Sequence, residues 1–135
     1  MIDVESEIFT LAATALRAAF PGVYVTGDYI KIPPSLPCVM ILEFENVPYR
    51  RTQTTSCQEN HIAVIYDVNV YSNKTVGKKT EARSLLKVVD DVLLGIGFNR
   101  SFTAPLPNYD DSTIYRLNAR YEAIISKEKV IYRRT

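Results

Sequence analysis

The sequence predicts an α+β fold in which a largely antiparallel β-sheet carries two α-helices on one face. An apolar residue stands at every second position from Ile62 to Val70, which is the period of a β-strand with one buried face. Residues 3–19 and 80–96 instead repeat apolar residues every three or four positions, as amphipathic helices do. Because no repeat or linker interrupts the pattern, residues 1–135 are expected to form a single domain.

Composition narrows the classes of protein to consider. Hydrophobic residues make up 47% and charged residues 23%, a balance typical of globular chains. The net charge of +1 argues against a broad basic face for nucleic acid. No apolar run approaches the roughly 20 residues that span a bilayer, so we expect no membrane segment. Cys38 and Cys57 are too few for a disulfide framework, and we expect free thiols in a reducing cytoplasm.

The first helix is expected to begin after a cap at Asp3 and to run to about Ala19. Its apolar face is expected to comprise Val4, Ile8, Leu11, Ala15, Ala18 and Ala19. Phe9, Leu16 and Phe20 extend the apolar arc past half of the circumference. Small alanines can widen such a stripe without consequence; alternatively, these three side chains meet another subunit.

A hairpin with a long tip is expected after two short extended pieces at 23–25 and 29–32. Prolines delay regular pairing until Cys38, where an apolar strand begins that reaches Glu45. A polar stretch at 46–60 then leads into the central strand at 61–72, so these two strands should pair as an antiparallel hairpin.

The hairpin tip contains the side chains best suited to grip a partner. These are Tyr49, Arg50 and Arg51. The alternative is that residues 46–60 form a solvated loop without a binding role.

The second helix has the cleanest periodicity in the chain, with Thr80 as its expected cap and Gly97 at the position of a C-cap glycine. Its apolar stripe is Ala82, Leu85, Leu86, Val89, Val92, Leu93 and Ile96. Three charged residues on the far side are expected to be solvated, namely Lys87, Asp90 and Asp91. Leu94 lies on the same side and is a candidate exposed apolar residue.

The C-terminal part is expected to contribute a short strand at 98–103, a proline-rich loop at 104–111 and a long strand at 112–126. Alternate residues of the long strand are polar, which predicts one solvent-exposed face carrying Arg116, Asn118, Arg120 and Glu122. The last residues, 127–135, are expected to add a further short strand.

No residue pattern predicts catalysis, a cofactor or a metal. His61 is the only histidine, and the nearest candidate nucleophile, Cys57, lies on the polar loop, where a fixed geometry is not expected. One histidine and two cysteines cannot supply a zinc site without carboxylates. No glycine-rich phosphate loop is present in the sequence. We therefore expect a non-enzymatic protein.

Two segments carry a resemblance to a known family: IYDVNVYSNKTVGKKTEARSLLKVVDDVLLGIGFNRSF (65–102) and PLPNYDDSTIYRLNARYEAII (105–125). They resemble the tail completion proteins of long-tailed bacteriophages, also called tail terminators or tail-to-head joining proteins. A strand ending in YSN, a GKKTEA helix entry and a final strand with IYR and ARY are similar to products of phage and prophage morphogenesis clusters of Gram-positive hosts.

The resemblance implies a small α+β subunit that forms a ring, commonly hexameric, at the head-proximal end of the virion tail. Such a ring stops polymerisation of the tail tube and offers a surface to the head connector, after assembly in the cytoplasm of the bacterial host. It implies the tail tube protein, the connector and other copies of the chain as partners. No binding residue of the family is transferred to this sequence.

Other functions stay open at this point. Head-closure proteins and tail tube subunits are the nearest alternatives within phage necks. A small-molecule-binding α+β domain would require a pocket between the helices and the sheet. A nucleic-acid-binding module could use Tyr49, Arg50, Arg51, Arg133 and Arg134, although the near-zero net charge argues against specific nucleic acid binding.

Overall fold

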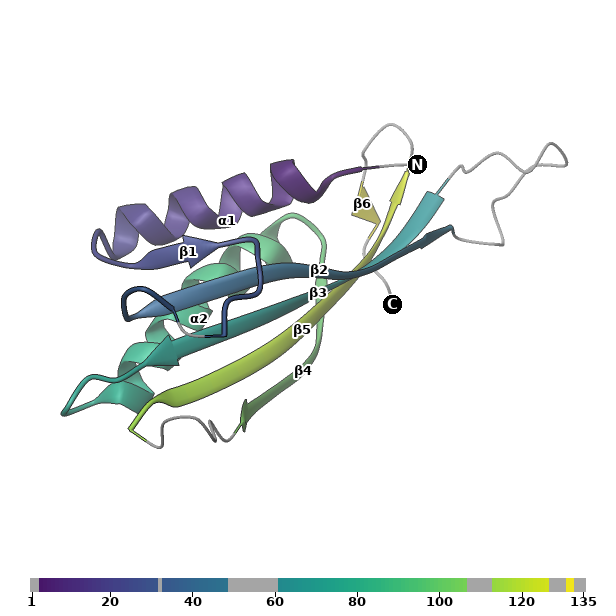
Figure 1. The fold of residues 1–135 in the computed structure, drawn as a ribbon. Helices are drawn as coiled ribbons and strands as arrows, with labels where there is room; N and C mark the ends of the chain where they lie inside the picture. Colours follow the sequence, from purple (N-terminus) through teal and green to yellow (C-terminus); the bar gives the residue numbers. More distant parts are fainter. Residues whose placement is uncertain (1–2, 32, 49–60, 107–112, 127–130, 133–135) are drawn as a thin grey trace, which may run out of the picture.

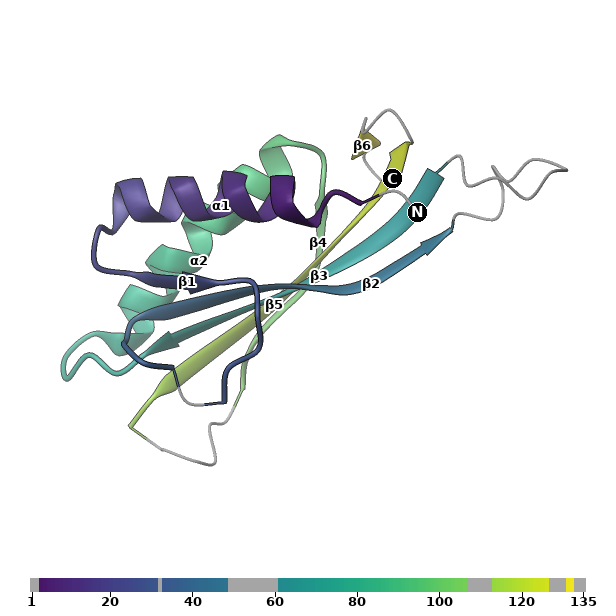
Figure 2. The same cartoon turned by 45° about the horizontal axis from the view of Figure 1, so that its top comes forward.

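The computed structural model describes residues 3–31, 33–48, 61–106, 113–126 and 131–132, and its fold is α+β as predicted. The elements are α1 (Glu5–Ala19), β1 (Tyr24–Thr26), β2 (Cys38–Pro48), β3 (His61–Ser72), α2 (Lys78–Gly95), β4 (Asn99–Leu106), β5 (Tyr115–Ser126) and β6 (Ile131–Tyr132). The sheet has the order β1-β2-β3-β5-β4, and β6 pairs with β5. β1 pairs with β2 in parallel, and the other described pairings are antiparallel. Both helices lie on one face of the sheet (Figures 1 and 2).

The central strand is the one that alternation predicts. β3 pairs with β2 on one side and with β5 on the other along nearly its whole length. Its five alternating apolar side chains are all fully buried in the core beneath the helices: Ile62, Val64, Tyr66, Val68 and Val70. The Tyr66 ring meets the Phe98 ring edge-on, with centroids 5.6 Å apart. The helices and the sheet therefore share one continuous core.

Helix α1 begins slightly later than predicted. Val4 occupies the N-cap position and makes no side-chain capping bond. Asp3 still contributes, because its Oδ1 accepts the backbone N–H of Glu5 at 3.2 Å. The side of α1 that faces the core carries Ile8, Ala12, Ala13 and Leu16. The predicted apolar face was thus rotated by part of a turn, and its member Leu11 is 49% exposed.

Helix α2 begins at Lys78, two residues before Thr80, so the predicted cap is wrong. Gly77 holds the N-cap position with a φ of 85°, where a side chain would be strained. The predicted C-terminus is confirmed. Gly97 has a φ of 115°, its N–H bonds to Leu94 at 3.2 Å, and the N–H of Phe98 bonds to Leu93 at 2.9 Å. This pair of bonds is a Schellman motif, which closes the helix and turns the chain into β4.

Several strand limits differ from those that the sequence predicts. The described residues of the expected extended piece, 29–31, form no strand. β2 continues to Pro48 because β3 offers partners that far. β4 continues to Leu106 through Pro105, and a proline is tolerated there because β4 is an edge strand in this region.

The two lateral edges of the sheet offer little to a further strand. β1 is only three residues long. β4 has a register shift between Arg100 and Phe102, and Pro105 lacks a backbone donor. Short strands, bulges and prolines are the features by which proteins prevent pairing at their edges. Contacts with other proteins are therefore expected through side chains at these edges, rather than through an added strand.

Two glycines near the end of α2 give a matched test of the helix terminus. Gly97→Ala should lower the free energy of unfolding by about 1–2 kcal/mol, because alanine is strained at a positive φ. Gly95→Ala should raise it by about 0.5–1 kcal/mol, because Gly95 is helical and a Cβ there meets no atom within 4 Å. Urea unfolding of both variants measures the difference. Shifts of the same sign would contradict the described terminus.

Candidate functional site

On the face of the sheet opposite the helices, the described residues form an apolar cover at one end. There Cys38, Met40 and Tyr71 form a second, smaller apolar cluster. The partly buried residues that pack on this cluster are Tyr24, Ile30, Leu36, Leu42 and Ile114. Beyond it, the sheet presents a surface that we call the open face, made of Phe44, Asp67, Asn69, Phe102, Arg116, Asn118 and Arg120. These side chains come from four neighbouring strands, so the sheet itself brings them together.

Amide and carboxylate side chains on β3 and β5 are joined across the open face. Asn69 lies directly opposite Asn118 in the strand register. Asn118 Nδ2 donates to Asp67 Oδ1 at 2.7 Å and to Asn69 Oδ1 at 3.1 Å. Arg116 donates to the same Asn69 oxygen through Nε at 3.2 Å and Nη2 at 3.0 Å. The bonds cross from strand to strand, so they hold these side chains in one arrangement.

The two arginines of the open face also lie over aromatic rings. The Cζ atom of Arg116 is 5.6 Å from the centroid of the Tyr71 ring, and that of Arg120 is 4.5 Å from the Phe44 ring. Arg120 Nε is in addition 3.5 Å from Asp67 Oδ1. Arg120 is thus positioned from two sides while its side chain remains 43% exposed. A positioned guanidinium loses less conformational entropy on binding than a free one.

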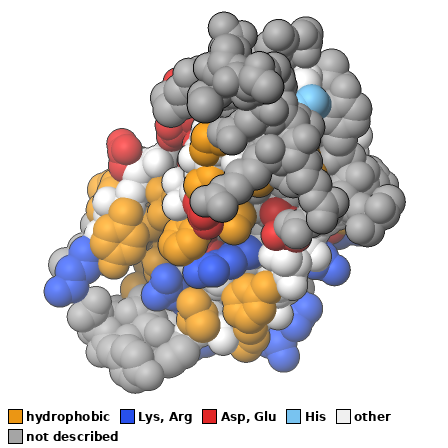
Figure 3. Space-filling model, turned by 90° about the vertical axis from the view of Figure 1, so that its right-hand side faces the viewer, with side chains coloured by type: hydrophobic (Ala, Val, Ile, Leu, Met, Phe, Trp, Pro, Cys, Tyr) orange, Lys and Arg blue, Asp and Glu red, His pale blue; other side chains and the backbone are white. Residues whose placement is uncertain are grey.

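Phenylalanines stay exposed on both sides of this polar network. Phe44 is 56% exposed and Phe102 is 43% exposed. Both lie at a break in strand pairing: Phe44 lies within the register shift of β2 between Glu43 and Glu45, and Phe102 directly follows the shift of β4 after Arg100. In the side view of Figure 3, Lys and Arg side chains form a band between hydrophobic side chains. Arginine and aromatic residues are the types that dominate protein–protein interfaces.

The predicted partner surface on α1 is not an exposed patch. Leu16 is completely buried, so its assignment to an interface is wrong for the folded chain. Phe9 and Phe20 are partly buried and pack against the main core. The Phe9 ring lies 3.5 Å from the position that a Cβ of Gly27 would take, which places it against the turn after β1. Leu94 is half-buried rather than exposed.

The partner-binding residues predicted at the hairpin tip lie outside the described residues. This applies to Tyr49, Arg50 and Arg51, and also to Cys57. The antiparallel hairpin itself is confirmed, since β2 and β3 pair up to Pro48 and Ile62. The paired strands extend well past both helices (Figures 1 and 2).

The sequence does not predict the combination of residues that makes the open face. Its alternation places Arg116, Asn118 and Arg120 on an exposed face, but Asn118 is only 4% exposed and the arginines are half-buried. No sequence pattern singles out Phe44 or Phe102. An arginine and a phenylalanine on different strands become neighbours only through the register. In the sequence, the alternation of polar residues along β5 was therefore the one signal that pointed to the open face.

The described titratable groups favour structural roles. Burial raises the pKa of the Cys38 thiol to about 11, so at neutral pH it is protonated and a poor nucleophile. Burial also raises the pKa of Tyr66 and Tyr121, with further contributions from Glu43 and Asp90, the carboxylates to which they donate. Among the described residues, no three His, Cys, Asp or Glu side chains are grouped as a metal would require. Neither described helix combines the length and apolarity needed to span a membrane.

A comparison with known proteins assigns the chain to no family, because no family model and no curated protein matches it.

The polar network of the open face should contribute measurably to stability. Asn118→Ala removes the amide that links Asp67 to Asn69, and it should lower the free energy of unfolding by about 1–3 kcal/mol. Asn73→Ala is the control, because Asn73 is exposed in the turn after β3, and its effect should stay within about 0.5 kcal/mol. Chemical denaturation compares the two. Equal midpoints would show that the network adds no stability.

Proposed function

We propose that this chain is a non-enzymatic structural protein of a long-tailed bacteriophage or prophage. In this proposal it is the tail completion, or terminator, subunit, which caps the tail tube and joins it to the head connector. It acts as a ring of copies, commonly hexameric, at the head-proximal end of the tail. Its partners are other copies of itself, the tail tube protein and the head connector.

The phage assignment is supported by the sequence resemblance of residues 65–102 and 105–125. In the structure these residues contain most of β3, all of α2, most of β4 and nearly all of β5. They build the centre of the sheet and the helix packed on it. The observed α+β fold agrees with the fold that the resemblance implies.

The observation that carries an assembly role is the open face. A chain acting alone would gain nothing from keeping Phe44 and Phe102 exposed beside two positioned arginines. The short β1 and the interrupted β4 make strand addition at the lateral edges unfavourable. We therefore assign the open face, together with the projecting β2–β3 hairpin, as the surface that meets a neighbouring subunit or the tail.

Complementation of a phage that lacks this product tests the proposal. The test variant is Phe44→Ser with Phe102→Ser, which removes the exposed aromatic groups of the open face. The control is Leu11→Ser with Val76→Ser, since Leu11 is 49% and Val76 is 81% exposed elsewhere on the molecule. Equal thermal unfolding of the two purified variants shows first that both fold.

We expect the open-face variant to accumulate full heads and unjoined tails in electron micrographs, while the control restores infectious particles. Exposed apolar groups at the centre of an interface often contribute about 2 kcal/mol or more each, enough to prevent assembly. If the deletion is harmful but the open-face variant complements it fully, the open face is not the docking surface. Joined tails of uniform length in the complete absence of the protein would refute the tail completion role.

A further inference from the structure

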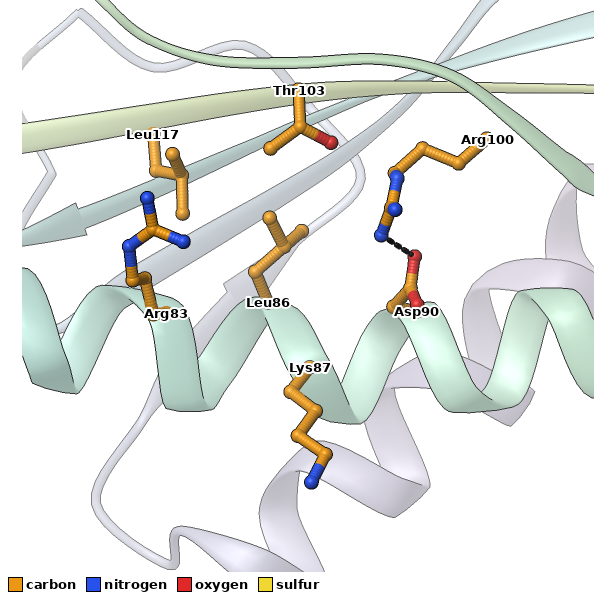
Figure 4. Close-up of a pocket in the computed structure, with 7 residues that line it drawn as sticks. All are labelled: Arg83, Leu86, Lys87, Asp90, Arg100, Thr103 and Leu117. Carbon is orange, nitrogen blue, oxygen red and sulfur yellow. Dashed lines mark hydrogen bonds and ion pairs between the residues drawn. The ribbon is translucent and has the colours of Figure 1, made fainter.

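A cavity lies between α2 and the edge strand β4, on the helix side of the sheet. Its volume is about 350 Å³, and it is lined by Arg83, Leu86, Lys87, Asp90, Arg100, Thr103 and Leu117 (Figure 4). This volume is near the lower end of those that hold small molecules. The cavity is separate from the open face, because β5 lies between them and turns Leu117 to one side and Arg116 and Asn118 to the other.

Positive charge prevails around the cavity. Two guanidinium groups are directed into it, Arg83 from α2 and Arg100 from β4, against the single carboxylate of Asp90. The third basic residue of the lining, Lys87, has its side chain turned away from the strand. An excess of positive charge beside a low-dielectric wall attracts an anion more strongly than the same charges in open solvent.

Arg100 is held in place from inside the protein. Its Nη1 donates to Asp90 Oδ1 at 2.9 Å, and the hydroxyl of Tyr121 donates to the same oxygen at 2.8 Å. Tyr121 is completely buried, so this chain of bonds runs from the core to the cavity wall. A guanidinium that is already oriented loses little freedom when it binds a second anion.

Arg83 is available for such an anion. It makes no ion pair with any residue in the described ranges, and its guanidinium is turned from α2 toward Leu117 (Figure 4). Lys87, one helical turn further on, points away from the strand and out of the space between the two arginines (Figure 4). Arg83 and Arg100 thus approach the cavity from opposite sides, and the side chain of Leu86 lies between them.

We propose that this cavity binds a carboxylate that carries a short aliphatic stem. A carboxylate matches the planar fork of a guanidinium with two parallel hydrogen bonds, and the Thr103 hydroxyl offers a further donor. Leu86, which lies between the two arginines and is 6% exposed, offers a small apolar contact for the stem, which a bare inorganic anion would leave unused. The same chemistry is found in a small free acid and in the acidic side chain of another protein.

The test is an NMR titration of the backbone amides around the cavity at low ionic strength, since salt screens exposed charges. The probes are butyrate, a blocked pentapeptide with a central glutamate, and inorganic phosphate. Arg83→Gln is compared with Lys87→Gln, because both remove one positive charge from α2 and only the first removes a group that points into the cavity. Unfolding curves of both variants establish that they fold equally well.

We expect Arg83→Gln to weaken carboxylate binding about tenfold, the effect of one charge-assisted hydrogen bond, and Lys87→Gln to change it less than about twofold. Tighter binding of the peptide identifies a protein side chain as the source, and tighter binding of butyrate identifies a free acid. If both variants lose the same carboxylate affinity, the attraction depends on net charge and not on the position of Arg83, and the proposal is overturned. Absent binding, or tighter binding of phosphate than of either carboxylate, would overturn it as well. None of these outcomes depends on the tail completion role.

Discussion

The constraint on which the rest of the structure depends is that both faces of β3 are covered by other side chains. One face of this strand lies in the apolar core beneath both helices, and the other carries Asp67 and Asn69 in the polar network. A shift of one residue in either pairing would move Tyr66 out of the core and a carboxylate into it. Both errors are costly, because buried polar groups need partners. The register of β2 and β5 against β3 is therefore strongly specified.

The same network that secures the register also shapes the outer surface. Asn118 and Asn69 are almost completely buried, although they lie on the face without helices. The bonds between them position Arg116, and Asp67 helps to position Arg120. An open sheet face would normally be covered with mobile, solvated side chains. In this protein hydrogen bonds order the centre of the open face, so the exposed aromatic side chains beside it are carried by a rigid part of the sheet.

β5 connects the two surfaces to which we assign binding. Its alternate residues supply arginines to the open face and Leu117 and Tyr121 to the helix side. Through Tyr121 and Asp90, the core also orients Arg100 at the cavity. Asp90 was expected to be merely solvated, and its actual role depends on a tyrosine 31 positions later in the chain. Substitutions in β5 would therefore affect both surfaces at once, whereas Arg83 acts on the cavity alone.

The sequence by itself determined the elements whose signal is local. Alternation identified β3 and β5, helical spacing identified α2, and Gly97 marked its end because only glycine tolerates that φ. Periodicity shows which residues share a face, but not what that face meets. The burial of Leu16 and the meeting of Arg120 with Phe44 were decided by the tertiary structure. They arise from packing and register between segments distant in sequence, which no local pattern encodes.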